Sequence, residues 1–419
     1  MTNKRYVITK NGLPLLAPSL QIPADASLPA SSRTWYLSVA AILTAATGAV
    51  AAWGITIIIH SIASLAYYGE IITAYTGIEN TERDLWIIGI PVAGAVLLIA
   101  VSRYTSPLLR AAGLTVAIGA GNPLGTESAA MLLNGGIGAW VGRLFRCTEE
   151  ECRILFTAGA CSTLGSLFGA PLAAIFLALE LCLPDRTFKN IWPVVAAAAT
   201  AGVASYLYRG TAPVLSFAAL PAMNGKAAVA YSVIAVLVGL WARLSTVLYK
   251  LIDKWFGKLT KYNKWYLLTV ALFTGVAGYI FPRILGTGEG YITDLLQAHV
   301  TLAILFALAF VKWIAWLFFS GANKTGSGII PLLVIGGAIG LLIGAPIQML
   351  FPAVMINAGI VVLVGMGAML AGTSRLLFTA IVLLLEMTHD INVALPAMLA
   401  CILAYGIAIF KSKTAQSDI

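Results

Sequence analysis

Charged residues are scarce in this chain of 419 residues: only 10% are Asp, Glu, Lys or Arg, while 60% are hydrophobic. A soluble domain carries about 25% charged residues. The composition therefore excludes a soluble domain and indicates a chain that crosses a membrane several times. Several apolar runs are too long for one crossing and too rich in glycine for straight helices, which indicates broken, tilted or re-entrant segments. The runs lie at about 35–66, 85–102, 108–145, 153–182, 191–208, 226–249, 265–282, 300–320, 328–349, 352–386 and 391–410. We therefore expect an all-α polytopic membrane protein.

Histidine and cysteine are also few, and their spacing does not suit a metal site. The three histidines lie far apart, and the five cysteines follow no metal-ligand pattern. An intramembrane enzyme would need a nucleophile–base pair or a metal cluster, and the sequence offers neither. We therefore expect no enzymatic activity, no metal and no cofactor.

The net charge of +9 reflects topology and does not indicate nucleic-acid binding, because the basic residues gather in a few places. Segment 250–264 holds five lysines against a single acid, Asp253. By the positive-inside rule this segment faces the cytosol, together with the basic N-terminal segment 1–33 and the tail 411–419. The N-terminal segment lacks the apolar core and cleavage site of a signal peptide. The acidic loop 69–84 suits the opposite side.

Two pairs of motifs recur about 200 residues apart and in the same order. GTESAAMLLNGG (125–136) is matched by GSGIIPLLVIGG (326–337), and AIFLALE (174–180) is matched by AIVLLLE (380–386). The repeats predict two homologous membrane halves, 34–208 and 209–410; chance similarity between Gly/Ala-rich segments is the alternative. In transporters, duplicated halves often have inverted topology, and their interrupted helices meet near the midplane to form the site.

The first motif of each half has the features of a helix start. GTES and GSGI each supply a glycine and a candidate hydroxyl cap before a helix-compatible run. A helix that begins in mid-membrane directs its unsatisfied N–H groups and the positive end of its dipole at whatever lies ahead. Two such starts from opposed halves would face a common point, where a small anion binds weakly enough to leave again.

Glu127 is the carboxylate at the first of these starts, and the second half has Gly328 at the corresponding position. A buried carboxylate is costly in a membrane and is by default a functional candidate. Ionised, it can take the place of the anion; protonated, it can swing away. We therefore predict that Glu127 is a gate that responds to pH and to anion occupancy, with simple capping of its own helix as the alternative.

Four other ionisable residues within the apolar runs are less specific candidates than Glu127. Glu180 and Glu386 end matching helices in the two halves, which favours a structural role for both. Lys312 and Arg375 either bond the carbonyls of a helix C-terminus or raise the positive potential of a pore, and structural use is again favoured.

The residues resemble the CLC family of chloride channels and chloride/proton antiporters, over roughly 85–410. GTESAAMLLNGGIGAWVGRLF resembles the family's GxEGP segment, and KWIAWLFFSGANKTGSGIIPLLVIGGAIG resembles the segment that leads into GxFxP. GACSTLGSLFGAPLAAIFLALEL and GMGAMLAGTSRLLFTAIVLLLEMTHDINVALPAML resemble two further segments of the family, and all four motifs occur in family order.

The resemblance implies a divergent prokaryotic-type member without a regulatory soluble domain. It implies two inverted-topology halves, a pore in each subunit of a homodimer, and a bacterial inner membrane location with both termini cytosolic. Glu127 falls on the gating glutamate. Chloride or a similar small anion would bind at the two helix starts, with the N–H groups of Ser128, Ile329 and Ile330 as donors. The implied anion-binding residues are Gly125, Thr126, Ser128, Gly328, Ile329 and Ile330.

The chain departs from the family pattern at several site positions. The Gly and Pro that follow the gating glutamate read Ser-Ala, and the phenylalanine of GxFxP is Ile329. The segment with the inner anion-binding serine has no clear counterpart, and Ser106 is its remaining candidate. The pore tyrosine of the last helix has no match. The family's inner proton-relay glutamate falls on Leu181, which leaves the neighbouring Glu180 as the candidate for a proton path.

These departures leave the transport mode open. Loss of the inner glutamate favours a passive channel, but fluoride/proton antiporters of the same family also lack it and still couple to protons. A second alternative is an inverted-repeat transporter for another substrate, such as fluoride or an organic solute. A transporter of organic or metal substrates would want ionisable residues from several broken helices, and this sequence offers essentially one carboxylate.

Overall fold

The computed structural model describes residues 33–71, 78, 84–102, 106–183, 187–216, 220–221, 223–259, 265–323 and 328–410. Within this part of the chain every regular element is a helix. Residues 1–32 and 411–419, which were expected in the cytosol, lie outside the described residues. The all-α fold class is confirmed.

The first half ends with α7, and it contains one long helix followed by shorter ones. Its elements are α1 (Thr34–Tyr68), α2 (Trp86–Val101), α3 (Pro107–Gly119), α4 (Thr126–Leu144), α5 (Glu149–Phe168), α6 (Pro171–Leu177) with its π-helical continuation (Ala178–Cys182), and α7 (Phe188–Arg209). The helix boundaries follow local chemistry. Thr148 and Glu151 form a capping box at the start of α5, and left-handed Gly169 ends it with φ 61°.

The second half begins with another long helix, α8, and contains the remaining elements. They are α8 (Gly225–Leu259), α9 (Tyr266–Ile280), a 3-10 turn (Pro282–Ile284), α10 (Gly290–Leu296), α11 (Leu302–Phe306), a π-helical stretch (Ala307–Val311), α12 (Lys312–Asn323), α13 (Ile330–Leu350), a 3-10 turn (Pro352–Val354), α14 (Ala358–Ser374), α15 (Leu377–Thr388), a 3-10 turn (Ile391–Val393) and α16 (Ala394–Phe410). Most of the predicted cytosolic segment 250–264 is therefore the end of α8, and residues 260–264 lie outside the described part.

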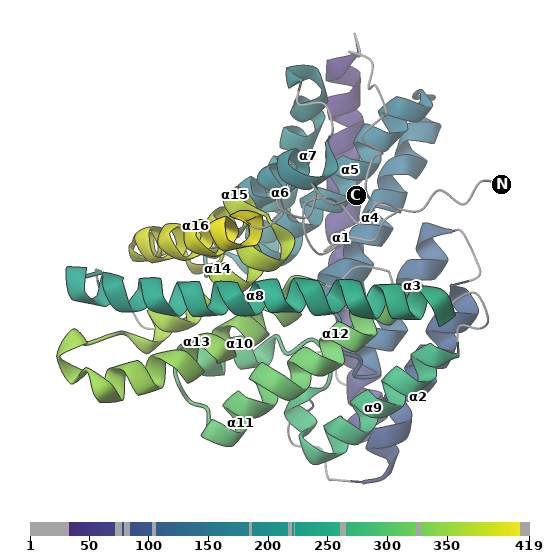
Figure 1. Ribbon diagram of the computed structural model, residues 1–419. Helices are drawn as coiled ribbons and strands as arrows, with labels where there is room; N and C mark the ends of the chain where they lie inside the picture. Colours follow the sequence, from purple (N-terminus) through teal and green to yellow (C-terminus); the bar gives the residue numbers. More distant parts are fainter. Residues whose placement is uncertain are drawn as a thin grey trace.

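The two halves repeat one packing scheme. In the first, α5 packs on α1, α4 and α7, and α1 packs on α7; in the second, α14 packs on α8, α13 and α16, and α8 packs on α16. The long helices α1 and α8 have 35 residues each. In Figure 1 the upright helices α1, α4, α5 and α7 lie at a steep angle to α8, α13, α14 and α16. The halves meet at several places, among them the packing of α2 on α9 and of α6 on α15.

The contact between α6 and α15 reveals the inverted topology. The end of α6 lies at the start of α15, because Glu180 accepts hydrogen bonds from the backbone N–H groups of Phe378 and Thr379, both at 2.9 Å. The end of α15 lies at the start of α6, because Glu386 accepts from the N–H groups of Leu172 and Ala173 at 2.9 and 2.8 Å. The two helices are therefore antiparallel neighbours, as inverted halves require.

Glycines allow the backbones of the inner helices to approach closely. A Cβ on Gly336 of α13 would lie 2.5 Å from the carbonyl oxygen of Gly365 on α14, and one on Gly138 of α4 would lie 2.7 Å from the carbonyl carbon of Leu155 on α5. Small residues at helix crossings permit this packing within membranes. The same device is used at corresponding crossings of the two halves.

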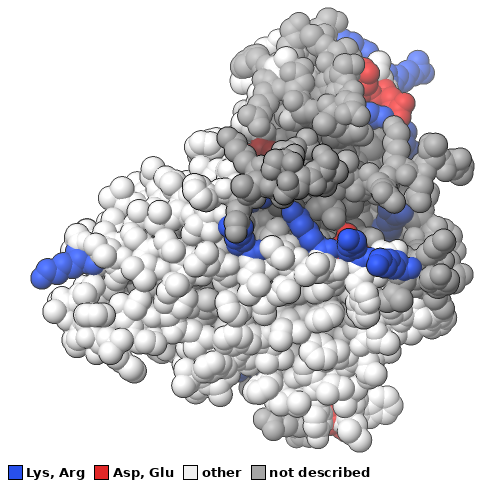
Figure 2. Space-filling view, in the orientation of Figure 1, with Lys and Arg blue, Asp and Glu red and all other residues white. Residues whose placement is uncertain are grey.

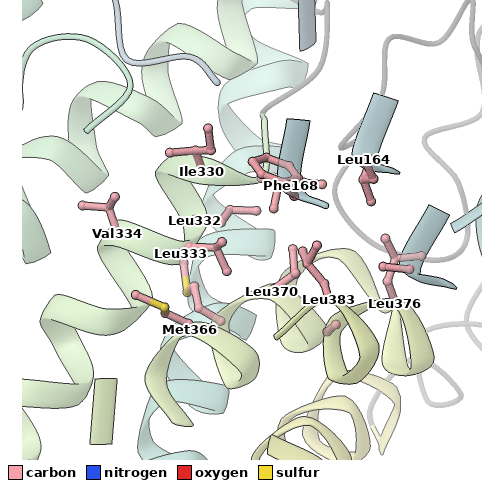
Figure 3. Close-up of a cluster of buried hydrophobic side chains, with 14 of the residues drawn as sticks. Leu164, Phe168, Ile330, Leu332, Leu333, Val334, Met366, Leu370, Leu376 and Leu383 are labelled. Atoms are coloured by element: carbon pink, nitrogen blue, oxygen red, sulfur yellow. The ribbon is translucent and has the colours of Figure 1, made fainter. Parts of the chain in front are cut away.

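A buried apolar core joins the halves behind the helix starts. Figure 3 shows side chains of α5 (Leu164, Phe168), α13, α14 and α15 gathered in one cluster. The outer surface is also largely apolar, and six helices of the described part are long and apolar enough to cross a membrane. Lys and Arg gather in a row over the C-terminal part of α8 in Figure 2, where Lys250, Lys254 and Lys258 are exposed. The protein is therefore an integral membrane protein.

Candidate functional site

The start of α4 and the start of α13 meet inside the molecule. Glu127 lies in the first turn of α4, and its Oε1 accepts hydrogen bonds from the backbone N–H groups of Ile329 and Ile330, the latter at 3.1 Å. These donors are the N-cap and first residue of α13, more than 200 residues away in sequence. The carboxylate of one half thus lies at the positive end of a helix of the other half.

Glycines at both starts make this approach possible. Gly328 precedes α13 with φ +77°, a left-handed conformation that L side chains rarely adopt. A Cβ at Gly328 would lie 2.7 Å from the backbone nitrogen of Gly125 and 3.0 Å from Glu127 Oε1. A Cβ at Gly125, the N-cap of α4, would overlap the carboxylate of Glu127. The two starts and the glutamate therefore form one tightly packed unit.

The site is closed to water in this state. Glu127 is 1% exposed, and Ile329 and Ile330 are 2% and 1% exposed. The second carboxylate oxygen, Oε2, has no hydrogen-bond partner within the described residues. Burial opposes a charge on Glu127, whereas the N–H groups and the dipole of α13 favour one. The balance between these effects decides whether the carboxylate stays at the start of α13.

The other residues expected at the first helix start differ in what they offer an anion. Thr126 and Ser128 are buried at 3% and 4% exposure. The backbone N–H of Ser128 donates to the carbonyl of Gly125 at 3.1 Å, and its hydroxyl donates to the same carbonyl at 2.5 Å. The expected donor N–H of Ser128 is therefore used inside its own helix turn. The N–H groups of Ile329 and Ile330, which Glu127 occupies, lie on the side of α13.

Ser106 is not brought to this site. It precedes α3 as the N-cap, and its neighbour Pro107 lies against α4 at Gly136, where an added Cβ would be 2.9 Å from Pro107 Cβ. Gly136 is nine residues beyond Glu127 on α4, or about 13 Å at 1.5 Å per residue. The start of α3 therefore lies beside the middle of α4.

Glu180 lies at the α6–α15 contact, with both carboxylate oxygens used there. Its Oε2 accepts from the hydroxyl of Thr379 at 2.6 Å in addition to the backbone donors of α15. Leu181, at the family's inner glutamate position, is half-buried and packs against the core. Through these bonds Glu180 caps the start of α15 at the junction of the halves.

Three residues linked to the site were not identified as site residues from the sequence. Glu289, just before α10, acts electrostatically on Glu127, and Arg209 at the end of α7 acts on Glu289. Tyr67 of α1 donates its hydroxyl hydrogen to the carbonyl of Ala120, at 3.1 Å, in the loop that enters α4. The one available signal was Glu289, a carboxylate inside the Gly-rich turn LGTGEG. Within the described residues no group of His, Cys, Asp and Glu suits a metal ion.

The chain is similar in sequence to a protein family and to individual transporters. The family model described as voltage gated chloride channel matches residues 88–409. The H(+)/Cl(-) exchange transporter ClcA of Vibrio campbellii is 28% identical over 299 residues, covering 70% of this chain and 64% of that protein. ClcA of Klebsiella pneumoniae is 28% identical over 300 residues, with the same two coverages of 70% and 64%. The chain thus matches less than two thirds of the length of these relatives.

Solved structures share the fold. A slow cyanobacterial Cl−/H+ antiporter superposes with a TM-score of 0.73 at 20% identity, covering 89% of this chain and 94% of the other. A CLC-type fluoride/proton antiporter gives 0.72 at 18% identity, with coverages of 91% and 96%. A eukaryotic CLC transporter gives 0.64 at 21% identity, with coverages of 90% and 72%. At these identities the likeness concerns the fold alone.

Proposed function

The chain belongs to the voltage-gated chloride channel family, and from this premise we propose that it moves small inorganic anions, chloride first among them, through a membrane path gated by Glu127. One observation carries the proposal. The carboxylate of Glu127 occupies the N–H groups of Ile329 and Ile330 at the start of α13, which are the donors that an anion would use.

The gate follows from competition for these donors. An ionised Glu127 and a permeating anion cannot both occupy the start of α13, because like charges at close range repel. Protonation removes the charge of the carboxylate and weakens its bonds to the donors, so an anion takes its place. Higher anion concentration and lower pH both favour the open state. Thr126, Gly125 and Gly328 line the same two helix starts.

Both transport modes remain part of the proposal. Passive conduction is supported by Leu181 at the inner glutamate position and by the use of Glu180 as a helix cap. Proton-coupled exchange is supported by the ClcA relatives, which are named H(+)/Cl(-) exchange transporters. Fluoride stays a candidate substrate because a fluoride/proton antiporter has the same fold.

The proposal includes a homodimer in the bacterial plasma membrane with cytosolic N- and C-termini. The dimer rests on the family resemblance. The orientation rests on the positive-inside rule, because the exposed lysines at the end of α8 would face the cytosol. The acidic stretch around Glu70 and Asp84 would then face the other side.

Anion efflux from liposomes tests the proposal directly. Purified protein is reconstituted, a chloride gradient is imposed, and chloride and external pH are recorded together. Chloride efflux that drives protons uphill with a fixed stoichiometry identifies exchange, and efflux without proton movement identifies a passive pore. If the folded wild-type protein moves none of chloride, fluoride, nitrate and bicarbonate, the proposed function is wrong.

A further inference from the structure

Lys312 is a buried cation with unusual surroundings. It begins α12 inside the apolar helical stretch Leu302–Asn323, and its side chain is 0% exposed. The ammonium Nζ donates to the carbonyls of Ile284 and Gly286 at 2.9 and 2.8 Å. Among the described residues no carboxylate lies within ion-pair distance of it. Such a charge is costly in a membrane interior, and it is retained where it serves function.

The carbonyls that Lys312 holds belong to a loop, residues 284–288, that contacts both helix starts. The N–H of Gly286 donates to the carbonyl of Gly121 at 2.8 Å, and Gly121 lies four residues before Gly125 at the start of α4. Gly288 packs toward α13, since a Cβ there would lie 3.3 Å from Val334 Cγ2 and 3.1 Å from Lys312 Nζ. Val334 is one turn into α13. The loop therefore bridges the segment that enters α4 and the first turns of α13.

A second side chain, Tyr67, also fixes the entry segment. Tyr67 of α1 donates its hydroxyl hydrogen to the carbonyl of Ala120 at 3.1 Å. Two successive carbonyls, of Ala120 and Gly121, are therefore held by groups from different halves of the molecule. The entry segment has little freedom, and the start of α4 follows it.

We propose that Lys312 is a positioning residue for the gate: by fixing the loop 284–288, it sets the position of the α4 start relative to the α13 start. This inference rests on the proposed gating by Glu127. The bonds from Ile329 and Ile330 to Glu127 require the two starts to be in register. An ammonium suits the task because it bonds two carbonyls at once and its charge strengthens both bonds.

A methionine at position 312 would keep the length of the side chain but could not donate. The carbonyls of Ile284 and Gly286 would lose their partner, and the loop would loosen. Glu127 would then hold the α13 start less firmly at high pH. Other ionisable groups around the site, namely Glu289, Arg209 and Tyr67, are unchanged by this substitution, so a change in the pH profile would report on Lys312.

The experiment compares chloride efflux from liposomes at pH 4.5 and 7.5 for wild type, Lys312→Met, Glu127→Gln and the double variant. For Lys312→Met we expect flux at pH 7.5 to rise about fivefold, which lowers the ratio between the two pH values. The double variant should match Glu127→Gln alone, because Lys312 acts through the gate. Tyr67→Phe should shift the ratio in the same direction by about twofold.

The control is Tyr231→Phe. Tyr231 is also fully buried, and its hydroxyl accepts a hydrogen bond from the N–H of Asn357 at 3.0 Å. Asn357 is the N-cap of α14 and belongs neither to the loop 284–288 nor to the segment that enters α4. Tyr231→Phe should leave the pH ratio unchanged. If Lys312→Met does not fold, the pH ratios of chloride flux in Tyr67→Phe and Tyr231→Phe are compared instead. Equal ratios in these two variants overturn the proposal.

The outcomes separate the two claims. A wild-type pH ratio in Lys312→Met and Tyr67→Phe, with a flat profile in Glu127→Gln, overturns the role of Lys312 and leaves the gate standing. A double variant that departs from Glu127→Gln alone also overturns it. A wild-type profile in Glu127→Gln overturns the gate itself.

Discussion

The two halves meet at two places where a carboxylate faces the start of a helix, and these places differ in symmetry. At the α6–α15 contact the exchange is reciprocal: Glu180 caps α15 and Glu386 caps α6, each through two backbone N–H groups. At the α4–α13 contact it is one-sided, because Glu127 faces α13 and Gly328 occupies the matching position. The reciprocal contact is one of those that join the halves, whereas at the one-sided contact only one half supplies a carboxylate, which we propose as the gate.

The largest expected effect comes from removing the charge at the one-sided contact. Glu127→Gln cannot form an anion, so it competes weakly for the donors of α13. A hydrogen bond to a charged group contributes about 1.5–3 kcal/mol, so flux at pH 7.5 should rise about tenfold or more and become independent of pH. Liposome chloride efflux between pH 4.5 and 7.5 measures this. A variant that retains the wild-type profile shows that Glu127 does not gate.

Adding a side chain at Gly328, on the α13 side of this contact, should have a smaller effect. Gly328→Ala forces an L residue into a left-handed conformation, at a cost of about 1–2 kcal/mol, and its methyl group would meet Gly125 and Glu127. We expect flux to fall about fivefold and the thermal unfolding midpoint to drop. Gly54→Ala is the control, since nothing lies within 4 Å of a Cβ at that helical glycine. Equal behaviour of the two variants contradicts the close contact of the helix starts.

The reciprocal contact should respond in the same direction from both sides, with the larger loss for Glu180 because its carboxylate also accepts from the hydroxyl of Thr379. Glu180→Gln and Glu386→Gln each weaken charge-assisted bonds to two N–H groups, so each should lower the free energy of unfolding by about 1–3 kcal/mol. The pH profile of transport should stay as in wild type. Thermal unfolding in detergent and liposome efflux measure the two quantities. If Glu180→Gln alone changes proton movement, Glu180 belongs to a proton path and the symmetry is incomplete.

The smallest effect is expected at Ser106. Its neighbour Pro107 lies beside the middle of α4, so Ser106→Ala should leave anion flux and selectivity unchanged within about twofold, as for a substitution away from a site. Competition between chloride, nitrate and fluoride in the efflux assay measures selectivity. A changed selectivity order would mean that α3 reaches the anion path after all.

The sequence was most informative where the two halves repeat each other. The paired motifs predicted the inverted halves, and the structure confirms them through α6 and α15. Glu127 and Gly328 were matched from the same motifs, and they do lie together. Both results depend on spacing within a helix, which sequence reveals directly.

The sequence was less informative about which groups are free to act. That the N–H of Ser128 is used by Gly125 depends on the conformation of a single turn. That Ser106 lies far from Glu127 depends on where α3 begins beside α4. The link from Lys312 through Gly286 to Gly121 joins residues distant in sequence through backbone carbonyls, whose partners leave no residue-type signature.

The reciprocal bonds of Glu180 and Glu386 have a consequence for the origin of the molecule. Each glutamate pairs the end of one helix with the start of its counterpart, and neither pairing needs the connection between α7 and α8. A half-length chain inserted in both orientations could therefore make the same two pairings with a second copy of itself. Fusion of two such copies would preserve the junction intact, and only afterwards could one copy keep a glutamate where the other has glycine.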